Sequence, residues 1–435
     1  MASPAGAARS TTLASGLRVM VLPQPQLHGA HMALYARVGS RFESTATNGL
    51  SHFLEHMLYR GTPSHRSAHE VNDAFESIGG YLYAATQVDY GVFSVTLPPE
   101  SLDEACGLFA EVLRSPTFSD IEIEKEIVCE EILEDLDDEG RQVDADNLSR
   151  TLIYPEHPLG FTITGTADQV RAFRREDLAA HHARHYTSAN SVLVLAGAVD
   201  PDVAIERCAQ AFDAFPRGER IVTPAPVHAQ KRARLRVVDN ASSQTELRVC
   251  LRAIPEFAPQ RAEMDMLMRV VDDGMSTRLY HRICDAKGLC YDVSASYDGY
   301  EDDGVVDFAA GVQHARTTVV LKEMFGLLED LAQNGPTEEE LAKARRRHRW
   351  EVDAMRDSPE DMAHYHGVEM LFDHTPSLDE RIAQNARVTA KDIQRLVSEI
   401  ATPDRLNVVA VGLLSRGEAS KLGDLVRGWR GAAGP

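Results

Sequence analysis

Cysteine is scarce in this 435-residue sequence, and its spacing excludes the common cysteine motifs. No CxxC pair occurs, so neither a zinc ribbon nor a redox dithiol is indicated. Scattered reduced thiols are the simplest interpretation and are typical of a cytoplasmic protein. We expect the pair nearest in sequence, Cys284 and Cys290, to pack rather than to react. The full set is Cys106, Cys129, Cys208, Cys250, Cys284 and Cys290.

Long apolar runs and an excess of positive charge are also missing. No apolar stretch near residue 1 has the length of a signal-peptide core, and no run approaches membrane-spanning length. The chain carries 45 basic and 66 acidic residues, a net charge of -21. This balance disfavours nucleic acids and anionic membranes as partners. We therefore expect a cytoplasmic protein that binds neither nucleic acid nor membrane.

Strand and helix patterns alternate along the whole chain. Residues 16–23 and 30–39 are rich in Val, Leu and aromatic residues, which is typical of strands. The pattern then predicts a helix at about 48–59, a strand pair within 79–97, a helix over 101–114 and a buried strand at 191–200. Ser119 stands three residues before Glu122, which predicts a capping box at the start of another helix.

The second half of the sequence repeats the plan of the first. Residues 175–197 align without gaps on residues 390–412, an offset of 215 that places Thr187 on Thr402 and Gly197 on Gly412. We predict an α+β fold of two homologous halves, each a mixed or antiparallel sheet with helices packed on one face. The proline-bearing segment 216–233 is the expected linker between domains at 1–215 and 234–435.

One short stretch, "SHFLEHMLYRGT" at 51–62, combines histidines with a glutamate on a predicted helix. On a helical wheel, His52, Glu55 and His56 gather opposite a stripe of leucine, phenylalanine and methionine. Histidines four residues apart can bind one ion, and H-x-x-E-H is the inverted zinc-protease pattern. The alternative is that this polar stripe is simply solvated.

A catalytic zinc needs a third protein ligand, and the acid-rich stretch 119–140 is the best place to look for it. Glu124 and Glu131 are seven residues apart and share a face with apolar residues. A carboxylate against apolar surface is costly unless it is paired or binds a metal. Metal ligation by one and support by the other would explain both. The alternative is that both acids reach solvent at the edge of this face.

The two motif-bearing stretches resemble those of a known family. "GLSHFLEHMLYRGT" followed by "EKEIVCEEI" is similar to the M16 metallopeptidases, which include insulin-degrading enzyme, pitrilysin and the mitochondrial processing peptidase. Glu131 lies 75 residues beyond His56, as in that family. The resemblance continues through "PLGFTITGT" and "GMSTRLYHRICDAKGLCYDV", spans both halves and fits the short, two-domain subfamily.

The resemblance implies a role for each residue of the motif. His52, His56 and Glu131 would bind Zn²⁺, Glu55 would act as the general base, and Glu124 would support the site. The implied function is a zinc-dependent endopeptidase that hydrolyses peptides or unfolded polypeptides in an enclosed chamber. The alternative is a non-catalytic, peptide-binding or structural subunit of the same kind of chamber. A maturase dedicated to one peptide is a third possibility.

Two departures from the family pattern concern substrate contacts. Tyr291 is present, but Cys284 stands where relatives often carry an arginine, with Arg282 and Arg278 nearby. Ala84 is kept in the strand expected to contact the substrate backbone, but Tyr83 replaces the usual asparagine. We expect Tyr291, Ala84 and Arg282 to contact substrate. Short members of the family pair two chains, so a homodimer or a heterodimer with a related subunit is expected, the latter supplying the missing arginine.

Another histidine cluster, in "AAHHARHYTS", invites comparison with the first. His181 and His185 have the same i, i+4 spacing, but no acid lies between them. We predict that these residues and His182 are surface or packing histidines.

Overall fold

The computed structural model describes residues 8–432 and 434, which divide into two compact units. The first unit comprises residues up to 134, 161–224 and 353–375, and the second comprises 135–160, 225–352 and residues from 376 onward. These units differ from the contiguous domains expected from the sequence, because each contains a segment from the other half of the chain. No helix among the described residues is long and apolar enough to cross a membrane.

The first unit is built on a six-stranded sheet in the order β1-β2-β6-β3-β5-β4. Its strands are β1 (Arg9–Thr12), β2 (Arg18–Pro23), β3 (Ala30–Ala36), β4 (Tyr81–Thr86), β5 (Gly91–Leu97) and β6 (Ser191–Gly197). Its helices are α1 (Leu50–Leu58), α2 (Ala68–Ser77), α3 (Leu102–Arg114), α4 (Ile121–Leu133), α6 (Ala167–Ala172), α7 (Arg175–His185), α8 (Pro201–Ala211) and α13 (Pro359–Leu371). Strand β3 is buried along its whole length between β5 and β6, and His31 is the one polar side chain in its otherwise apolar sequence.

The second unit contains a five-stranded sheet in the order β7-β11-β8-β10-β9. Its strands are β7 (Arg234–Val238), β8 (Thr245–Ala253), β9 (Cys290–Gly299), β10 (Gly304–Val312) and β11 (Leu406–Val411). Its helices are α5 (Ala145–Ile153), α9 (Arg261–Val271), α10 (Arg278–Tyr280), α11 (Thr317–Asn334), most of α12 (Glu338–Met355), α14 (Leu378–Arg387), α15 (Ala390–Ile400) and α16 (Arg416–Gly428). Residues 212–233, which include the expected linker, form no helix or strand.

The two sheets repeat one another in order and in register, which confirms the predicted pair of homologous halves. In each, one pair of strands is parallel (β2 with β6, β7 with β11) and the neighbouring pairs are antiparallel. Leu34 lies opposite Phe93 and Leu193 in the first sheet. Val249 lies opposite Phe308 and Val408 in the second. All three positions are related by the same offset of 215 that the sequence alignment gave.

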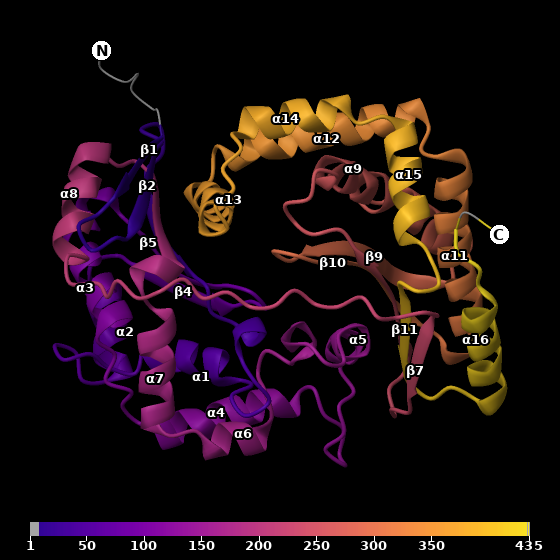
Figure 1. The fold of residues 1–435 in the computed structure, drawn as a ribbon, viewed down its shortest axis with the longest axis horizontal. Helices are drawn as coiled ribbons and strands as arrows, with labels where there is room; N and C mark the ends of the chain where they lie inside the picture. Colours follow the sequence, from indigo (N-terminus) through magenta and orange to yellow (C-terminus); the bar gives the residue numbers. More distant parts are fainter. Residues whose placement is uncertain (1–7, 433, 435) are drawn as a thin grey trace. The chain divides into compact units, whose positions relative to one another are not determined.

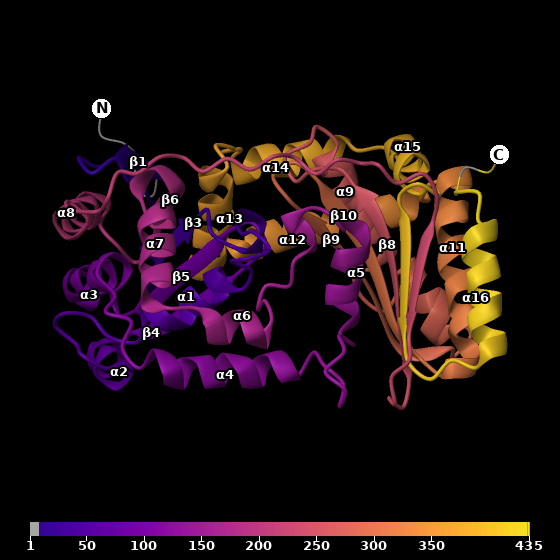
Figure 2. The same cartoon turned by 60° about the horizontal axis from the view of Figure 1, so that its bottom comes forward.

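A helix from the opposite half of the chain covers one face of each sheet, in addition to the helices expected on the other face. Figure 1 shows α13 on one side of the first sheet and α3 and α8 on the other. In the second unit, α5 and α11 lie on opposite sides of the sheet (Figure 2). Ala363 and Leu371 of α13 pack against Val194 and Tyr35, and Leu148 of α5 packs against a cluster on β11.

The capping box predicted at Ser119 is wrong. Helix α4 begins after Asp120, which has a left-handed backbone (φ 55) and makes no side-chain cap. Phe118 also has a positive φ of 51, so a left-handed position stands on each side of Ser119 and the regular N-cap geometry is not formed. Its hydroxyl instead shares a hydrogen bond of 3.1 Å with Thr117 Oγ1.

Candidate metal centre

Helix α1 places two histidines and a glutamate of the motif on one side of a buried helix. Its apolar residues Leu50, Phe53, Leu54, Met57 and Leu58 are all buried, as the predicted stripe requires. The opposite side is not solvated either, because His52 is only 8% exposed. The structure therefore excludes the interpretation of this stripe as an ordinary wet face.

The first turn of α1 is held by Glu43, a residue that the sequence did not single out. Gly49 caps the helix with a left-handed backbone (φ 90). The buried Glu43 carboxylate accepts hydrogen bonds from the backbone N–H groups of Gly49 (2.9 Å) and Ser51 (2.6 Å). A carboxylate suits this position because a helix N-terminus presents free N–H groups and partial positive charge. The start of the motif helix is thus fixed from outside the motif.

Three potential ligand atoms converge between α1 and α4. His52 Nε2 lies 3.5 Å from Glu131 Oε1, and His56 Nε2 lies 3.7 Å from Glu131 Oε2. Ligand atoms of all three residues lie within 4.8 Å of one another, and no other group of this kind is present in residues 8–432 or at 434. The geometry thus brings together the three residues expected to bind metal.

Glu124 supports this cluster from the same helix as Glu131. Its Oε1 lies 2.7 Å from His56 Nδ1, and its Oε2 forms an ion pair with Arg60. The bond to Nδ1 leaves His56 Nε2 directed at Glu131 with its lone pair available. Arg60 is a further residue that the sequence did not identify, because it lies just beyond the end of α1.

The two glutamates of α4 do not share one environment, which corrects the expectation that both face apolar surface. Glu124 is buried at 4% exposure, but the Glu131 side chain is 43% exposed. Ile127, which lies between them on α4, is 45% exposed. Glu131 contacts the histidines from the exposed edge of the interface between α1 and α4. Burial against apolar residues is therefore not what orients its side chain.

Glu55 lies beside the ligand cluster and is fixed by the edge strand β4. Thr86 Oγ1 donates a hydrogen bond of 2.5 Å to Glu55 Oε2. Burial raises the pKa of the Glu55 carboxyl above its ordinary value, and the bond from Thr86 opposes that shift. A carboxylate with a raised pKa is a stronger base. Thr86 was not predicted, because it comes from a strand thirty-one positions away in sequence.

The pKa values of His52 and His56 are shifted in opposite directions. Burial lowers the pKa of His52 to about 3, with a further contribution from the neighbouring His56. Burial also opposes protonation of His56, but Glu124, Glu55 and Glu131 together raise the pKa of His56 above its ordinary value. In the absence of an ion, His52 is neutral and thus in the form that binds metals.

The donor set fits zinc. A tetrahedral zinc ion with ligands at ~2.1 Å holds each pair of ligand atoms about 3.4 Å apart. His52 Nε2 and His56 Nε2 each lie close to that spacing from a different oxygen of Glu131, at 3.5 and 3.7 Å. Two imidazoles and one carboxylate also leave one tetrahedral position open for water, as catalytic zinc sites require. His52, His56 and Glu131 could therefore hold the ion, with Glu124 orienting one ligand.

A pocket of ≈ 420 Å³ adjoins the cluster. It is lined by Glu55, His56, Tyr59, Arg60, Ala68, Asn72, Leu82, Tyr83, Ala84 and Glu124. Ala84, an expected substrate contact, therefore lies next to the candidate metal centre on the edge strand β4. Tyr83 is 49% exposed there, so the residue that replaces the usual asparagine borders the same pocket.

The other two expected substrate contacts belong to the second unit. Tyr291 is 92% exposed at the start of β9. Arg282 lies in a π-helical turn, His281–Asp285, and its Nε donates to Glu323 at 2.8 Å. Arg278 is bound by Glu340 and Asp330 at 2.6 and 2.8 Å and therefore serves the local structure. The structure does not bring these residues together with the metal cluster within one unit.

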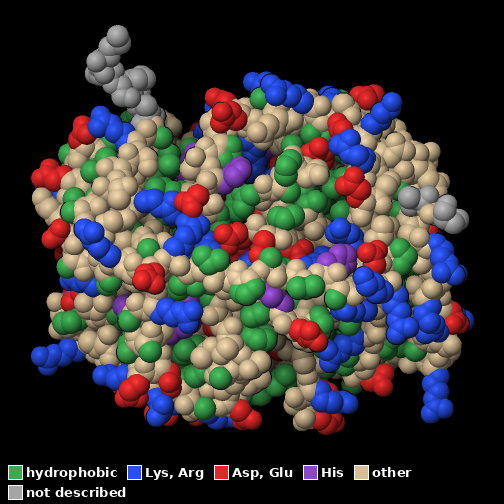
Figure 3. Space-filling model, viewed as in Figure 1, with side chains coloured by type: hydrophobic (Ala, Val, Ile, Leu, Met, Phe, Trp, Pro, Cys, Tyr) green, Lys and Arg blue, Asp and Glu red, His purple; other side chains and the backbone are tan. Residues whose placement is uncertain are grey.

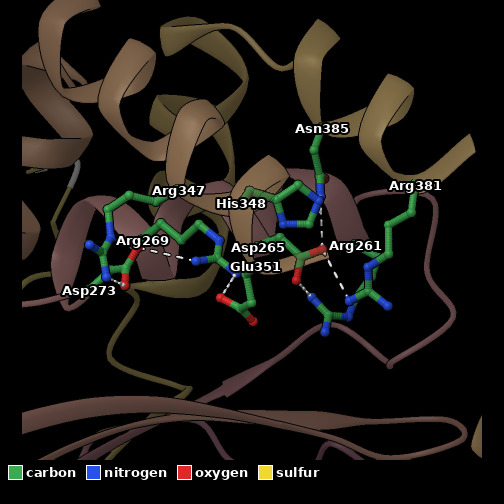
Figure 4. Close-up of polar contacts among 9 residues, drawn as sticks. All are labelled: Arg261, Asp265, Arg269, Asp273, Arg347, His348, Glu351, Arg381 and Asn385. Carbon is green, nitrogen blue, oxygen red and sulfur yellow. Dashed lines mark hydrogen bonds and ion pairs between the residues drawn. The ribbon is translucent and has the colours of Figure 1, made fainter. Parts of the chain in front are cut away.

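The second unit carries a network of charged residues around helix α9. In the order of elements, α9 comes after β8 just as α1 comes after β3. Likewise, α12 comes after β10 and α11, just as α4 comes after β5 and α3. On α9, Asp265 and Arg269 have the i, i+4 spacing of the two motif histidines. Arg269 binds Glu351 of α12 at 2.5 Å, and Asp265 forms an ion pair with Arg261 (Figure 4).

The remaining contacts of this network are made by α12 and α14. Arg347 binds Asp273 at 2.6 Å, and Arg381 reaches Asp265 at 3.3 Å. Burial alone would raise the pKa of Asp265, but Arg261 and Arg381 lower it below its ordinary value. Guanidinium groups thus supply the positive charge here, consistent with the absence of a metal motif in the second half.

The histidines of α7 pack as predicted. His181 and His185 are buried, with rings 4.2 Å apart. His181 Nε2 shares a hydrogen bond with Ser51 Oγ (3.0 Å), and His185 Nδ1 lies 2.8 Å from the carbonyl oxygen of Arg37. His182 Nε2 lies 2.8 Å from the carbonyl oxygen of Leu113. These contacts explain the three histidines without an ion.

Comparison with known proteins agrees with this geometry. Residues 18–167 match the model of the Insulinase family (peptidase family M16), and residues 172–347 match that of the peptidase M16 inactive domain. The chain is 30% identical over 424 residues to a protein of Mycobacterium tuberculosis named an uncharacterized zinc protease, covering 95% of this chain and 93% of the relative. A Streptomyces coelicolor protein of the same description is 28% identical over 433 residues, covering 97% and 93%.

Solved structures share the fold at lower identity. A protease from Helicobacter pylori has a TM-score of 0.87 at 21% identity, covering 94% of this chain and 100% of that one. A structure from Pseudomonas fluorescens described as a peptidase M16 inactive domain has a TM-score of 0.86 at 22% identity, covering 94% and 98%. With these matches over nearly its whole length, the chain belongs to the M16 family of peptidases.

Proposed function

We propose that this protein is a zinc-dependent endopeptidase. The observation that carries the proposal is the spacing of the His52, His56 and Glu131 atoms, which suits one tetrahedral ion beside the Glu55 carboxylate. The names of the relatives support zinc and proteolysis at the level of the family. The inverted motif supplies the acid–base group that such a reaction needs.

The chain's own residues have distinct tasks in this proposal. His52, His56 and Glu131 hold the ion, and Glu124 keeps His56 in the required tautomer. When bound, zinc would supply Lewis acidity that polarises a peptide carbonyl and makes water more acidic. The Glu55 carboxylate would take a proton from the attacking water and return it to the leaving amine. Thr86 holds one oxygen of Glu55, so the carboxylate keeps its direction during both transfers.

The substrate is a peptide or an unfolded segment of a polypeptide. Ala84 lies on the free edge of the first sheet beside the pocket, where an extended backbone can pair with β4. Tyr291 and Arg282 remain proposed contacts from the second unit. The paired assembly, as a homodimer or with a related subunit, and the cytoplasmic location stay predictions.

A single substitution tests the mechanism. Glu55→Gln keeps the three metal ligands, so zinc content should stay at one ion per chain while cleavage of a mixed peptide pool falls by about 10²–10⁴-fold. Glu130→Gln, an exposed acid on α4, is the matched control and should leave both quantities unchanged. Full cleavage by the Glu55 variant would refute the assigned base.

The same assay separates the alternative function. If the wild-type chain binds zinc but cleaves nothing, alone or after dimerisation, then the non-catalytic subunit is the correct interpretation. The retention of Glu55 beside all three ligands favours the enzyme, because a subunit that only binds peptides has no use for a buried base held by Thr86.

A further inference from the structure

Two cysteines of the second unit lie in contact at the surface. Cys284 Sγ and Cys290 Sγ are 3.6 Å apart, and both side chains are half-buried. The other four cysteines are buried. The pair packs against the core of the unit, as expected from the sequence, but its exposure also lets a small reagent reach the thiols.

The segment between the two thiols is exposed, and side chains outside it contact it at two residues: Arg316 donates to the carbonyl oxygen of Gly288, and Lys287 pairs with Glu323. Cys284 stands in the π-helical turn His281–Asp285, and Cys290 begins β9. Residues 285–288 are all exposed, and Gly288 has a left-handed backbone (φ 56). Ile283 and Val293, which flank the segment, are buried and anchor it. Because the sulfur atoms are already in contact, forming a bond of about 2.0 Å needs only a small movement of this exposed loop.

Both substrate contacts expected in the second unit flank this segment, Arg282 before Cys284 and Tyr291 after Cys290. Between β9 and β10 the register shifts, so that three steps from Val293 to Cys290 face two steps from Ala310 to Val312. This bulge places an extra residue next to Cys290, and bulges redirect side chains out of the regular pleat. Tyr291 is accordingly 92% exposed. Arg282 lies two positions before Cys284, in the same π-helical turn.

We propose that Cys284 and Cys290 form a reversible intramolecular disulfide that restrains the segment holding Arg282 and Tyr291. The bond itself is independent of the function proposed above, whereas its effect on peptide cleavage rests on that function. The oxidant is a low-molecular-weight disulfide such as oxidised glutathione. In the oxidised form the loop between the π-helical turn and β9 is cross-linked beside the exposed tyrosine.

The exchange proceeds in two balanced steps. The Cys284 thiolate attacks one sulfur of the reagent, whose S–S bond breaks and releases one equivalent of thiol. Cys290 then loses its proton and attacks Cys284 Sγ in the mixed disulfide, which releases the second equivalent. The protein thiols lose two protons and two electrons, and the reagent gains them as two thiols. A reducing dithiol reverses the sequence.

The environment of the pair sets the order and the rate of these steps. Burial raises the pKa of both thiols, and contact with Cys284 helps raise that of Cys290 to about 12. The contact from Cys290 partly opposes the shift at Cys284, so Cys284 is the first nucleophile. Because only thiolates attack, the rate should rise about tenfold per pH unit near neutral pH.

Peptide mapping of the folded, full-length protein tests the bond. After incubation with oxidised glutathione and alkylation, the wild type should yield a cross-linked Cys284–Cys290 peptide lacking two hydrogen atoms. The variants Cys284→Ser and Cys290→Ser should instead keep glutathione on the remaining thiol, because no second cysteine can displace it. Cys129→Ser, which removes a buried thiol of the other unit, should cross-link like the wild type. Wild-type protein that stays fully alkylatable, or that carries glutathione on both cysteines, would overturn the proposal.

Cleavage assays then test the consequence. Oxidation should lower kcat/KM for peptides in the wild type, and a dithiol should restore it. The two serine variants cannot form the cross-link, so they should not show this loss of kcat/KM. Unchanged cleavage by cross-linked, active enzyme would overturn the restraint on Arg282 and Tyr291. If neither form cleaves any peptide while the cross-link forms, the proposed peptidase function fails and the disulfide stands.

Discussion

Glu124 is the residue on which the candidate metal centre most depends without binding the ion itself. It is buried, it contacts His56 Nδ1 and it is paired with Arg60. Burial would raise the pKa of Glu124, but His56 and Arg60 lower it below its ordinary value. The acid is therefore charged at neutral pH, which strengthens the histidine as a ligand.

Replacing this acid should weaken metal binding without removing a ligand. We expect Glu124→Gln to lower zinc affinity by about 10–100-fold, because the amide cannot orient His56 as a carboxylate does. Competition with a chromophoric chelator measures the affinity. Glu126→Gln, at an exposed position of the same helix, is the control. An unchanged affinity in the Glu124 variant would show that Glu124 serves only the pair with Arg60.

The sequence was informative about this site where one helix carries the chemistry. Helical spacing alone placed His52, Glu55 and His56 together and singled out Glu124 and Glu131, and the resemblance then assigned the ligand role to Glu131. Thr86 and Glu43 could not be predicted, because they come from separate segments and reach the site only through sheet and loop packing. The burial of α4 was also misjudged, since isoleucines lie on both of its faces and give no clear apolar stripe.

At the scale of elements, the repeat was predictable but the exchange of helices was not. The alignment at an offset of 215 matches α7 to α15 and β6 to β11 along nearly their whole lengths. That regularity reflects one strand order used twice. Which sheet each amphipathic helix covers depends on tertiary packing, and the sequence of α13 is compatible with either sheet.

The contact of α13 with the first sheet can be tested at one glycine. A Cβ atom on Gly367 would lie 2.2 Å from Tyr35 Cε2, and Tyr35 is fully buried. We expect Gly367→Ala to lower the free energy of unfolding by about 1–3 kcal/mol through overpacking. Gly107→Ala in α3, where a Cβ meets no atom within 4 Å, should raise it by roughly 0.5–1 kcal/mol. Urea unfolding measures both, and stabilisation by both would contradict the close packing of α13.

The charged network between α9, α12 and α14 makes the second element-scale prediction. Asp265 neutralises Arg261 and lies close to Arg381. We expect Asp265→Ala to destabilise the protein by about 1.5–3 kcal/mol, because it removes a largely buried carboxylate that both Arg261 and Arg381 contact. Differential scanning calorimetry should show the loss. Asp424→Ala, which removes an exposed partner of Arg427, should leave the transition temperature almost unchanged.

At the scale of the whole molecule, stability should depend on pH through buried histidines. Burial lowers the pKa of His31, His185 and His348 to about 4 in each case. The unfolded chain binds these protons near pH 6.5, before the folded chain does. The stability that these histidines contribute by staying neutral in the folded protein is therefore fully present above pH 6.5. It is lost as the pH falls from 6.5 towards 4.

The size of this effect can be measured. Each buried histidine should contribute up to about 1.4 kcal/mol per pH unit within that window. Urea unfolding at pH 7, 6 and 5 gives the slope, and His348→Gln should reduce it by one histidine's share. A wild-type stability that is flat from pH 7 to 5 would contradict the burial of these side chains in neutral form.

Charge on the molecular surface is mixed rather than uniform on the face seen in Figure 3, where acidic and basic side chains are interspersed. The net charge of -21 is thus not gathered into a single field on that face. The sequence predicted the total, but the distribution follows from how strands and helices place individual side chains.

The cover that α13 provides for the first sheet has a consequence for synthesis. Strands β3, β5 and β6 are complete once residue 197 has been made, yet the apolar face formed by Val92, Val194 and Ala196 is packed against Ala363 and Leu371. Elongation at ~5–20 residues per second leaves roughly ten to thirty seconds between these events. During that interval the nascent first half presents an uncovered apolar sheet to the ribosome's surroundings, and translation must continue deep into the second half before the first can finish folding.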